Sequence, residues 1–268
     1  MSEAAPLARG IPLRAIAPNA ITALALCFGL TGIRYAISAT GINPQPGDWE
    51  RAIGAIIIAG LLDGIDGRVA RLLKGQSRFG AELDSLSDVI AFGVSPAMIL
   101  YLWSLQQFPR LGWICALSMA VSCALRLARF NASIDVEDQP HKSAGFLTGV
   151  PAPAGAGLAF LPLYLWIVTD NEWFRNPFVV APWAAFVAIL MISNVATFTW
   201  GSLRLRRHIR LEVILLAALV GTSLFSEPWI TLIGIVVLYV GSIPFSIRSY
   251  AKVKRQSAPL AQPDDLDI

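Results

Sequence analysis

The sequence is poor in charged residues, which make up 15% of its 268 residues, whereas apolar residues make up 55%. Soluble domains average about 25% charged residues, so this composition excludes the ordinary soluble class. There are only two histidines, and the three cysteines share no metal-ligand spacing and are expected to be apolar core residues. Residues 1–10 contain no apolar signal-peptide core and no cleavage site, so we expect the first long apolar run to remain as a membrane helix.

Apolar stretches close to the ~20 residues needed to cross a bilayer recur along the whole chain. Because these runs are continuous rather than alternating, they predict helices and not the strands of a β-barrel. We expect an all-α integral membrane protein in the lipid bilayer, with no nucleic-acid partner. It has one domain, residues 1–255, and a disordered cytoplasmic tail, residues 256–268. About eight transmembrane helices are expected, at 17–38, 49–73, 82–104, 111–132, 151–169, 179–200, 208–225 and 228–247.

The connections between these spans differ in charge from one side to the other. Most of the 21 lysines and arginines lie before the first span, after the second, fourth and sixth spans, and after the eighth. All tryptophans except Trp200 flank the other connections, as expected of indole rings at one membrane–water interface. Since positive charge marks the cytoplasmic side, we expect a multi-pass protein of the cell (inner) membrane with both termini in the cytoplasm.

Four aspartates lie at the cytoplasmic ends of the second and third expected spans. Asp63 and Asp66 are three residues apart and Asp84 and Asp88 four apart, so each pair shares one face of a helix. The short connection at 75–80 makes the two helices antiparallel neighbours. The four carboxylates therefore converge, and without a partner they would repel. A divalent cation relieves that repulsion, and oxygen ligands in this number suit magnesium, manganese or calcium.

Two other interpretations of the aspartates remain open. They form structural ion pairs with Arg68, Arg71 or Arg78, or they relay protons or ions in a transporter. The glycines favour a ligand site, because Gly67 lies on the same stripe as the aspartates and Gly80 is close by. Small residues there leave room for a bulky group such as a nucleotide-bearing lipid headgroup.

Residues 63–88 match the pattern D-x-x-D-G-x-x-A-R, eight residues, G-x-x-x-D-x-x-x-D at every specified position and spacing. This stretch resembles the signature of the CDP-alcohol phosphatidyltransferases, whose core has six membrane spans, so two further helices are expected here. The resemblance implies a two-ion site for Mg²⁺ or Mn²⁺, with Asp88 also as general base, and transfer of a phosphatidyl group from a CDP-lipid to an alcohol with release of CMP. It further implies a homodimer. The residues implied are Asp63, Asp66, Asp84 and Asp88 for the metal and Gly67, Ala70, Arg71 and Gly80 for the CDP-lipid.

The stretches LRLARFN (125–131) and FLTGVPAP (146–153) resemble the phosphatidylserine synthase branch of this family, with Val150 in place of the usual leucine. Arg126, Arg129 and Asn131 are the expected acceptor-binding residues, since arginine holds a carboxylate through two hydrogen bonds. Anchoring of a helix end is the alternative for both arginines. Asn19, in PNAIT, either touches the nucleotide or caps the first helix. The expected substrates are CDP-diacylglycerol and L-serine, and the alternative enzyme is phosphatidylglycerol-phosphate synthase, which accepts glycerol 3-phosphate.

Overall fold

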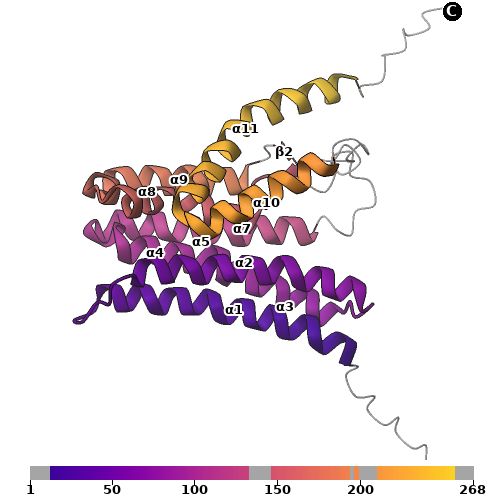
Figure 1. Ribbon diagram of the computed structural model, residues 1–268, viewed down its shortest axis with the longest axis horizontal. Helices are drawn as coiled ribbons and strands as arrows, with labels where there is room; N and C mark the ends of the chain where they lie inside the picture. The colour runs from indigo at the N-terminus through magenta and orange to yellow at the C-terminus, as the bar shows by residue number, and fades with distance from the viewer. Residues whose placement is uncertain (1–12, 133–145, 194–195, 199–209, 257–268) are drawn as a thin grey trace, which may run out of the picture.

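The computed structural model describes residues 13–132, 146–193, 196–198 and 210–256, and within them the chain forms a bundle of eight helical rods (Figure 1). Two of the rods are composite, since α3 (Arg78–Asp88), the π-helical segment η1 (Val89–Val94) and α4 (Ser95–Trp103) run on without a break and α7 (Ala152–Ala159) is followed directly by α8 (Leu161–Thr169). Single-turn 3₁₀ segments, η2 (Leu105–Gln107) and η3 (Glu172–Arg175), lie in connections. The rods are α1 (Leu13–Thr40), α2 (Asp48–Leu72), α3 (Arg78–Asp88) with η1 (Val89–Val94) and α4 (Ser95–Trp103), α5 (Pro109–Ala132), α7 (Ala152–Ala159) with α8 (Leu161–Thr169), α9 (Pro177–Ile192), α10 (Arg210–Ser226) and α11 (Pro228–Gln256).

This arrangement confirms the expected all-α, multi-pass membrane architecture. Five of the described rods are long and apolar enough to cross a bilayer: α1, the α3–α4 rod, α5, the α7–α8 rod and α11. Helices α9 and α10 are apolar but shorter, at 16 and 17 residues. Helix α2 has 25 residues, but its last third carries the charged residues of the acidic stretch. The expected tail lies outside the described residues apart from Gln256, the last residue of α11.

The sixth span was predicted too long. Helix α9 ends at Ile192, and residues 196–198 form a short strand, β2 (Ala196–Phe198), instead of a helix. This strand pairs antiparallel with β1 (Phe146–Thr148), with Leu147 opposite Thr197. Apolar composition alone does not separate a helix end from a short strand, and the β-branched residues of this stretch favour the strand.

The turn between β1 and α7 needs a glycine. Gly149 has φ of 76°, in the left-handed region, and a Cβ there would lie 2.9 Å from the carbonyl oxygens of Met191 and Ser193. A side chain would therefore clash as well as strain the backbone. Pro151 follows as the N-cap of α7, so the chain enters α7 along a fixed path beside the end of α9.

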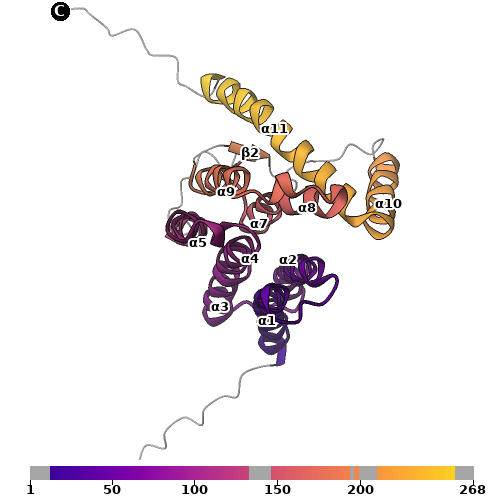
Figure 2. The same ribbon diagram turned by 90° about the vertical axis from the view of Figure 1, so that its left-hand side faces the viewer.

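Small residues let three rods approach closely at the π-helical segment. A Cβ on Gly29 of α1 would lie 2.8 Å from Ala91 Cα, and a Cβ on Gly93 would lie 2.9 Å from Cys123 Cβ of α5. Ala91, Phe92 and Cys123 are almost fully buried. The segment directly after Asp88 is thus held between α1 and α5, which fixes the position of the acidic end of α3. Figure 2 shows α1, α2 and α3 grouped together, with α10 at the edge of the bundle beside α11.

Candidate active site

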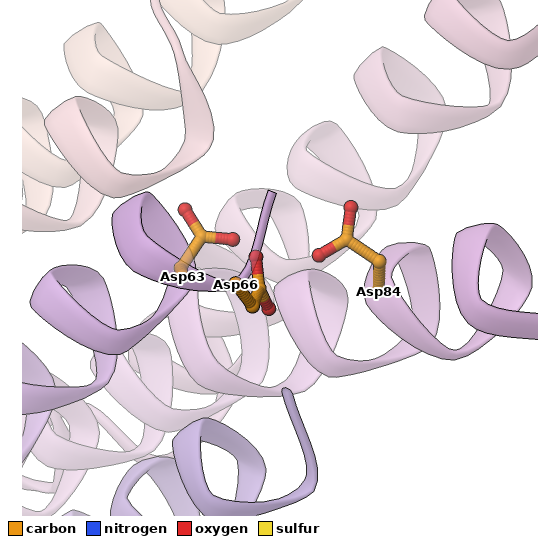
Figure 3. Close-up of side chains that lie close together, drawn as sticks. All are labelled: Asp63, Asp66 and Asp84. Atoms are coloured by element: carbon orange, nitrogen blue, oxygen red, sulfur yellow. The ribbon is translucent and has the colours of Figure 1, made fainter. Parts of the chain in front are cut away.

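Three of the predicted aspartates meet between α2 and α3. Asp63, Asp66 and Asp84 each offer one carboxylate oxygen to this meeting point. These three oxygens lie within 4.8 Å of one another. Figure 3 shows the three side chains turned toward a common region. Asp66 is buried and the other two are half-buried. The predicted convergence of these carboxylates is therefore confirmed.

Asp88 stands at the inner edge of this cluster. It is the last residue of α3, one turn beyond Asp84, and its carboxyl group lies close enough to Asp63 to interact with it. The π-helical segment η1 begins at the next residue. Wide π-turns of this kind occur frequently at functional sites. The four aspartates thus form one continuous acidic surface across α2 and α3.

The structure does not support the ion-pair interpretation of the aspartates. Within the described ranges, the only bridge between a basic and an acidic side chain joins Arg51 to Asp48, at the other end of α2. The side chains of Arg68, Arg71 and Arg78 are exposed, and none forms an ion pair with the cluster. Clustered carboxylates without cationic partners are costly unless a cation binds them. The oxygen-only donor set fits a hard divalent ion such as Mg²⁺ or Mn²⁺.

Helix α1 supports the cluster through a residue that was not among the predicted site residues. Thr22 is buried, and its hydroxyl lies 2.6 Å from Asp66 Oδ2. Ser87 of α3, also buried, donates to the backbone carbonyl of Thr22 at 3.3 Å. Together these contacts fix α1 against both acidic helices. The PNAIT stretch contains Thr22, but its local pattern does not indicate which helix lies opposite, so the contact with Asp66 could not be read from the sequence.

Asn19 does not cap the first helix. Helix α1 begins at Leu13, so Asn19 lies inside it, and that alternative is wrong. A Cβ on Gly80 would lie 2.7 Å from Asn19 Oδ1. The absence of a side chain at Gly80 therefore leaves room for the Asn19 amide beside the start of α3. The pair therefore borders the acidic cluster, and a role for either residue in binding a nucleotide stays a prediction.

The signature residues after Asp66 present an open surface. A Cβ on Gly67 would meet only Arg71 Nη1, at 4.0 Å, and a Cβ on Gly64 would meet nothing within 4 Å. Ala70 is half-exposed on the same helix, and Arg71 is exposed in the last turn of α2. This face of α2 is free to accept a bulky group, as the small residues predicted.

The three predicted acceptor-binding residues make different contacts, and their role in binding the acceptor stays a prediction. Arg126 lies near enough to Asp88 for their charges to interact, and its buried Nε forms no hydrogen bond with any described residue. Arg129 instead donates from Nη1 to the carbonyl oxygen of Ile192 at 2.9 Å, at the end of α9. Asn131 donates to Ser85 Oγ of α3 at 2.9 Å. Of the three, Arg126 faces the site, while Arg129 and Asn131 hold neighbouring helices.

The fold and the site together define a multi-pass membrane protein with an acidic surface at one end of its helices, built from carboxylates that suit a divalent cation. The family described as CDP-alcohol phosphatidyltransferase matches residues 15–200, and a second description, CDP-alcohol phosphatidyltransferase 2, matches residues 208–244. The first match covers more than half of the chain and contains all four aspartates. The chain belongs to the CDP-alcohol phosphatidyltransferase family.

Relatives with assigned names point to one branch of this family. A protein of Mycobacterium tuberculosis named CDP-diacylglycerol–serine O-phosphatidyltransferase is 36% identical over 241 residues, which cover 90% of this chain and 81% of the relative. Proteins with the same name from Helicobacter pylori and Methanocaldococcus jannaschii are 35% and 38% identical over 182 and 141 residues. These alignments cover 66% and 52% of this chain, and 70% and 60% of the two relatives.

Proposed function

We propose that this enzyme transfers a phosphatidyl group from CDP-diacylglycerol to the hydroxyl group of L-serine and releases CMP. The observation that carries this proposal is the meeting of three signature aspartates, with Asp88 beside them, on a surface without ion-pair partners among the described residues. An acidic site filled by divalent cations suits the two charged phosphates of a diphosphate. The choice of serine rests on the shared name of the relatives.

Two divalent ions, Mg²⁺ or Mn²⁺, are the proposed cofactors. Asp63, Asp66 and Asp84 hold them, and Asp88 is close enough to share one. When bound, such ions neutralise the diphosphate and stabilise the departing CMP. Thr22 orients Asp66 through its 2.6 Å hydrogen bond, the kind of outer contact that sets the direction of a metal ligand.

The chemistry of the chain's own residues is a single displacement. Asp88 accepts the proton of the serine hydroxyl as its oxygen forms a bond to the phosphorus that carries the lipid. The bond from that phosphorus to the CMP oxygen then breaks, and CMP leaves with the electron pair. Arg71 holds a phosphate oxygen on the open face of α2, and Arg126 receives the serine carboxylate beside Asp88.

The site faces the cytoplasm in this proposal, because the acidic cluster lies at the end of the bundle where the basic connections gather. Water-soluble serine and CMP then enter and leave on that side, while the acyl chains stay in the bilayer.

The deciding experiment supplies purified protein with CDP-diacylglycerol and one acceptor at a time: L-serine, glycerol 3-phosphate or inositol phosphate. We expect CMP to appear with serine, to stop when EDTA is added, and to return with excess Mg²⁺ or Mn²⁺. CMP released only with glycerol 3-phosphate assigns the chain to phosphatidylglycerol-phosphate synthesis. No CMP with any acceptor, together with ion flux across sealed vesicles, assigns it to transport.

A further inference from the structure

Helix α11 lies outside the 15–200 match that contains the aspartates, yet it is packed firmly on the bundle. At its start, Trp229 stacks on the fully buried ring of Tyr164, with ring centroids 6.3 Å apart. Farther along, the helix contacts strand β2. Between these two anchors, the face of α11 that carries Val236 and Ile243 is buried. The side chains on this face therefore have fixed positions relative to α7 and α8.

One of these side chains is polar and lines a groove that reaches the helix carrying Asp63. Leu232, Ile235, Val236 and Tyr239 follow helical spacing and line a groove of about 280 Å³, together with residues of α2, η1, α7 and α8. The groove also touches Gly60 and Leu61, less than one turn before Asp63. Tyr239 ends this stripe, and its hydroxyl group is buried. The phenol is thus the polar end of an otherwise apolar wall.

Tyr239 lies in the electrostatic neighbourhood of Arg126, which in turn lies near Asp88. The guanidinium of Arg126 lies near enough to Tyr239 and Asp88 to interact electrostatically with both. The Nε atom of Arg126 is buried and forms no hydrogen bond with the described residues, so this donor is available to a ligand. A buried donor without an acceptor is costly, which makes an anionic group the natural complement of this corner.

The chemistry of serine matches this arrangement. Two carbon atoms separate its hydroxyl oxygen from its carboxylate carbon, so a serine whose hydroxyl lies at Asp88 has its carboxylate within reach of residues beside Asp88. Arg126 is such a residue, whereas Arg129 and Asn131 are engaged with Ile192 and Ser85. A phenol O–H and a guanidinium N–H both donate to carboxylates.

We propose that Tyr239 is a specificity-determining residue: its hydroxyl and the Arg126 guanidinium bind the carboxylate of the acceptor amino acid. This inference rests on the proposed function. It places acceptor recognition on α5 and α11, apart from the acidic helices α2 and α3 that handle the diphosphate. The α11 helix then makes part of the site, in addition to its packing on the bundle.

The test is Tyr239→Phe, which keeps the ring and removes the hydroxyl. Because the variant loses a hydrogen bond to a charged group, the KM for L-serine should rise by about tenfold or more. The KM for CDP-diacylglycerol should be unchanged. L-serine methyl ester keeps the hydroxyl and the amine but lacks the carboxylate charge. Its KM, or its inhibition constant where it is not turned over, should be the same in the variant and the wild type. A purely structural role would change all three constants together.

Tyr101→Phe is the matched control, because that tyrosine packs against Trp113 on α5, away from Arg126. It should leave every constant unchanged. Tyr239→His is the second variant, since it restores a donor, and it should give a serine KM between those of wild type and Tyr239→Phe. If wild type uses serine and both Tyr239 variants keep its serine KM, the inference is overturned while the proposed function stands. If wild type releases no CMP with serine, the proposed function itself fails.

Discussion

The two ends of helix α2 each hold a buried aspartate, but their surroundings differ. Asp48, in the first turn, is 3% exposed and accepts hydrogen bonds from Ser38 Oγ, the backbone N–H of Gln45 and Arg51 Nη1. Asp66, 18 residues later, is 5% exposed and receives one side-chain hydrogen bond, from Thr22, with Asp63 and Asp84 beside it. One carboxylate is surrounded by donors, and the other lies among like charges.

This difference teaches how to separate structural from functional acidic residues within one membrane protein. The hydrogen bond from Ser38, followed by those from Gln45 and Arg51, outweighs burial and lowers the pKa of Asp48 below its ordinary value. A carboxylate that accepts these hydrogen bonds stabilises the connection between α1 and α2. The cluster at the other end has the opposite character, because its carboxylates crowd one another and none forms an ion pair with a described basic side chain. Substitutions at the two ends should therefore have opposite effects on stability and activity.

The largest effect is expected at Asp88. Asp88→Asn should lower kcat by about 10²–10⁴-fold, because the proton acceptor is lost, while CDP-diacylglycerol still binds. In cation-free buffer the same change should raise the Tm, since it removes one of several like charges. Turnover kinetics, lipid binding and thermal unfolding in detergent measure the three quantities. Retained kcat would remove Asp88 from the role of base, and a lower Tm would contradict the repulsion inferred here.

A smaller effect is expected at Thr22, the residue that gives Asp66 its one side-chain hydrogen bond. Thr22→Val keeps the shape of the side chain and removes the hydroxyl, which should raise the Mg²⁺ or Mn²⁺ concentration for half-maximal activity by about 10–100-fold. Saturating cation should restore most of the activity. Thr31→Val is the matched control, since Thr31 bonds only to the backbone of its own helix. An unchanged cation requirement would show that Asp66 is oriented without help from α1.

The smallest effect on activity is expected at Asp48. Asp48→Asn should lower the Tm and leave kcat and the cation requirement unchanged, because its partners lie at the far end of the helix. The lowered pKa means that Asp48 contributes stability in full above its ordinary pKa of 3.8 and loses it as the pH falls through the lowered value. The difference in Tm between wild type and variant should therefore shrink in strong acid. A difference that does not vary with pH would show that the charge of Asp48 is irrelevant to stability.

Much of this structure was predictable from the sequence because lipid imposes simple rules. Continuous apolar runs specify helices. For seven of the eight expected spans, the predicted ends lie within a few residues of the ends of the described helices, except that the last helix extends nine residues farther than predicted. The sixth failed at residues 196–198, where pairing with residues 146–148 decides the conformation. Such pairing depends on residues 50 positions apart, which no local pattern reports.

The site was predictable to the extent that it follows helical spacing. Asp63, Asp66 and Asp84 meet because their spacings place them on facing stripes. The contact of Thr22 with Asp66 was not predictable, since it depends on which helix lies opposite, whereas anchoring of a helix end was one of the two interpretations of Arg129. Arg129 and Arg126 are three residues apart on one helix, but one meets the end of α9 and the other faces Asp88.

The π-helical segment after Asp88 has a further consequence for how this rod tolerates change. An α-helix turns by roughly 100° per residue, so a segment wound more widely sets the phase between everything before it and everything after it. Deletion of one residue from 89–94 would convert the π-helical segment into regular α-helix. It would also rotate one part of the rod relative to the other, so that either the aspartates of α3 or the buried Trp103 of α4 would turn away from their partners. Insertions and deletions should therefore be excluded from these six positions more strictly than substitutions are.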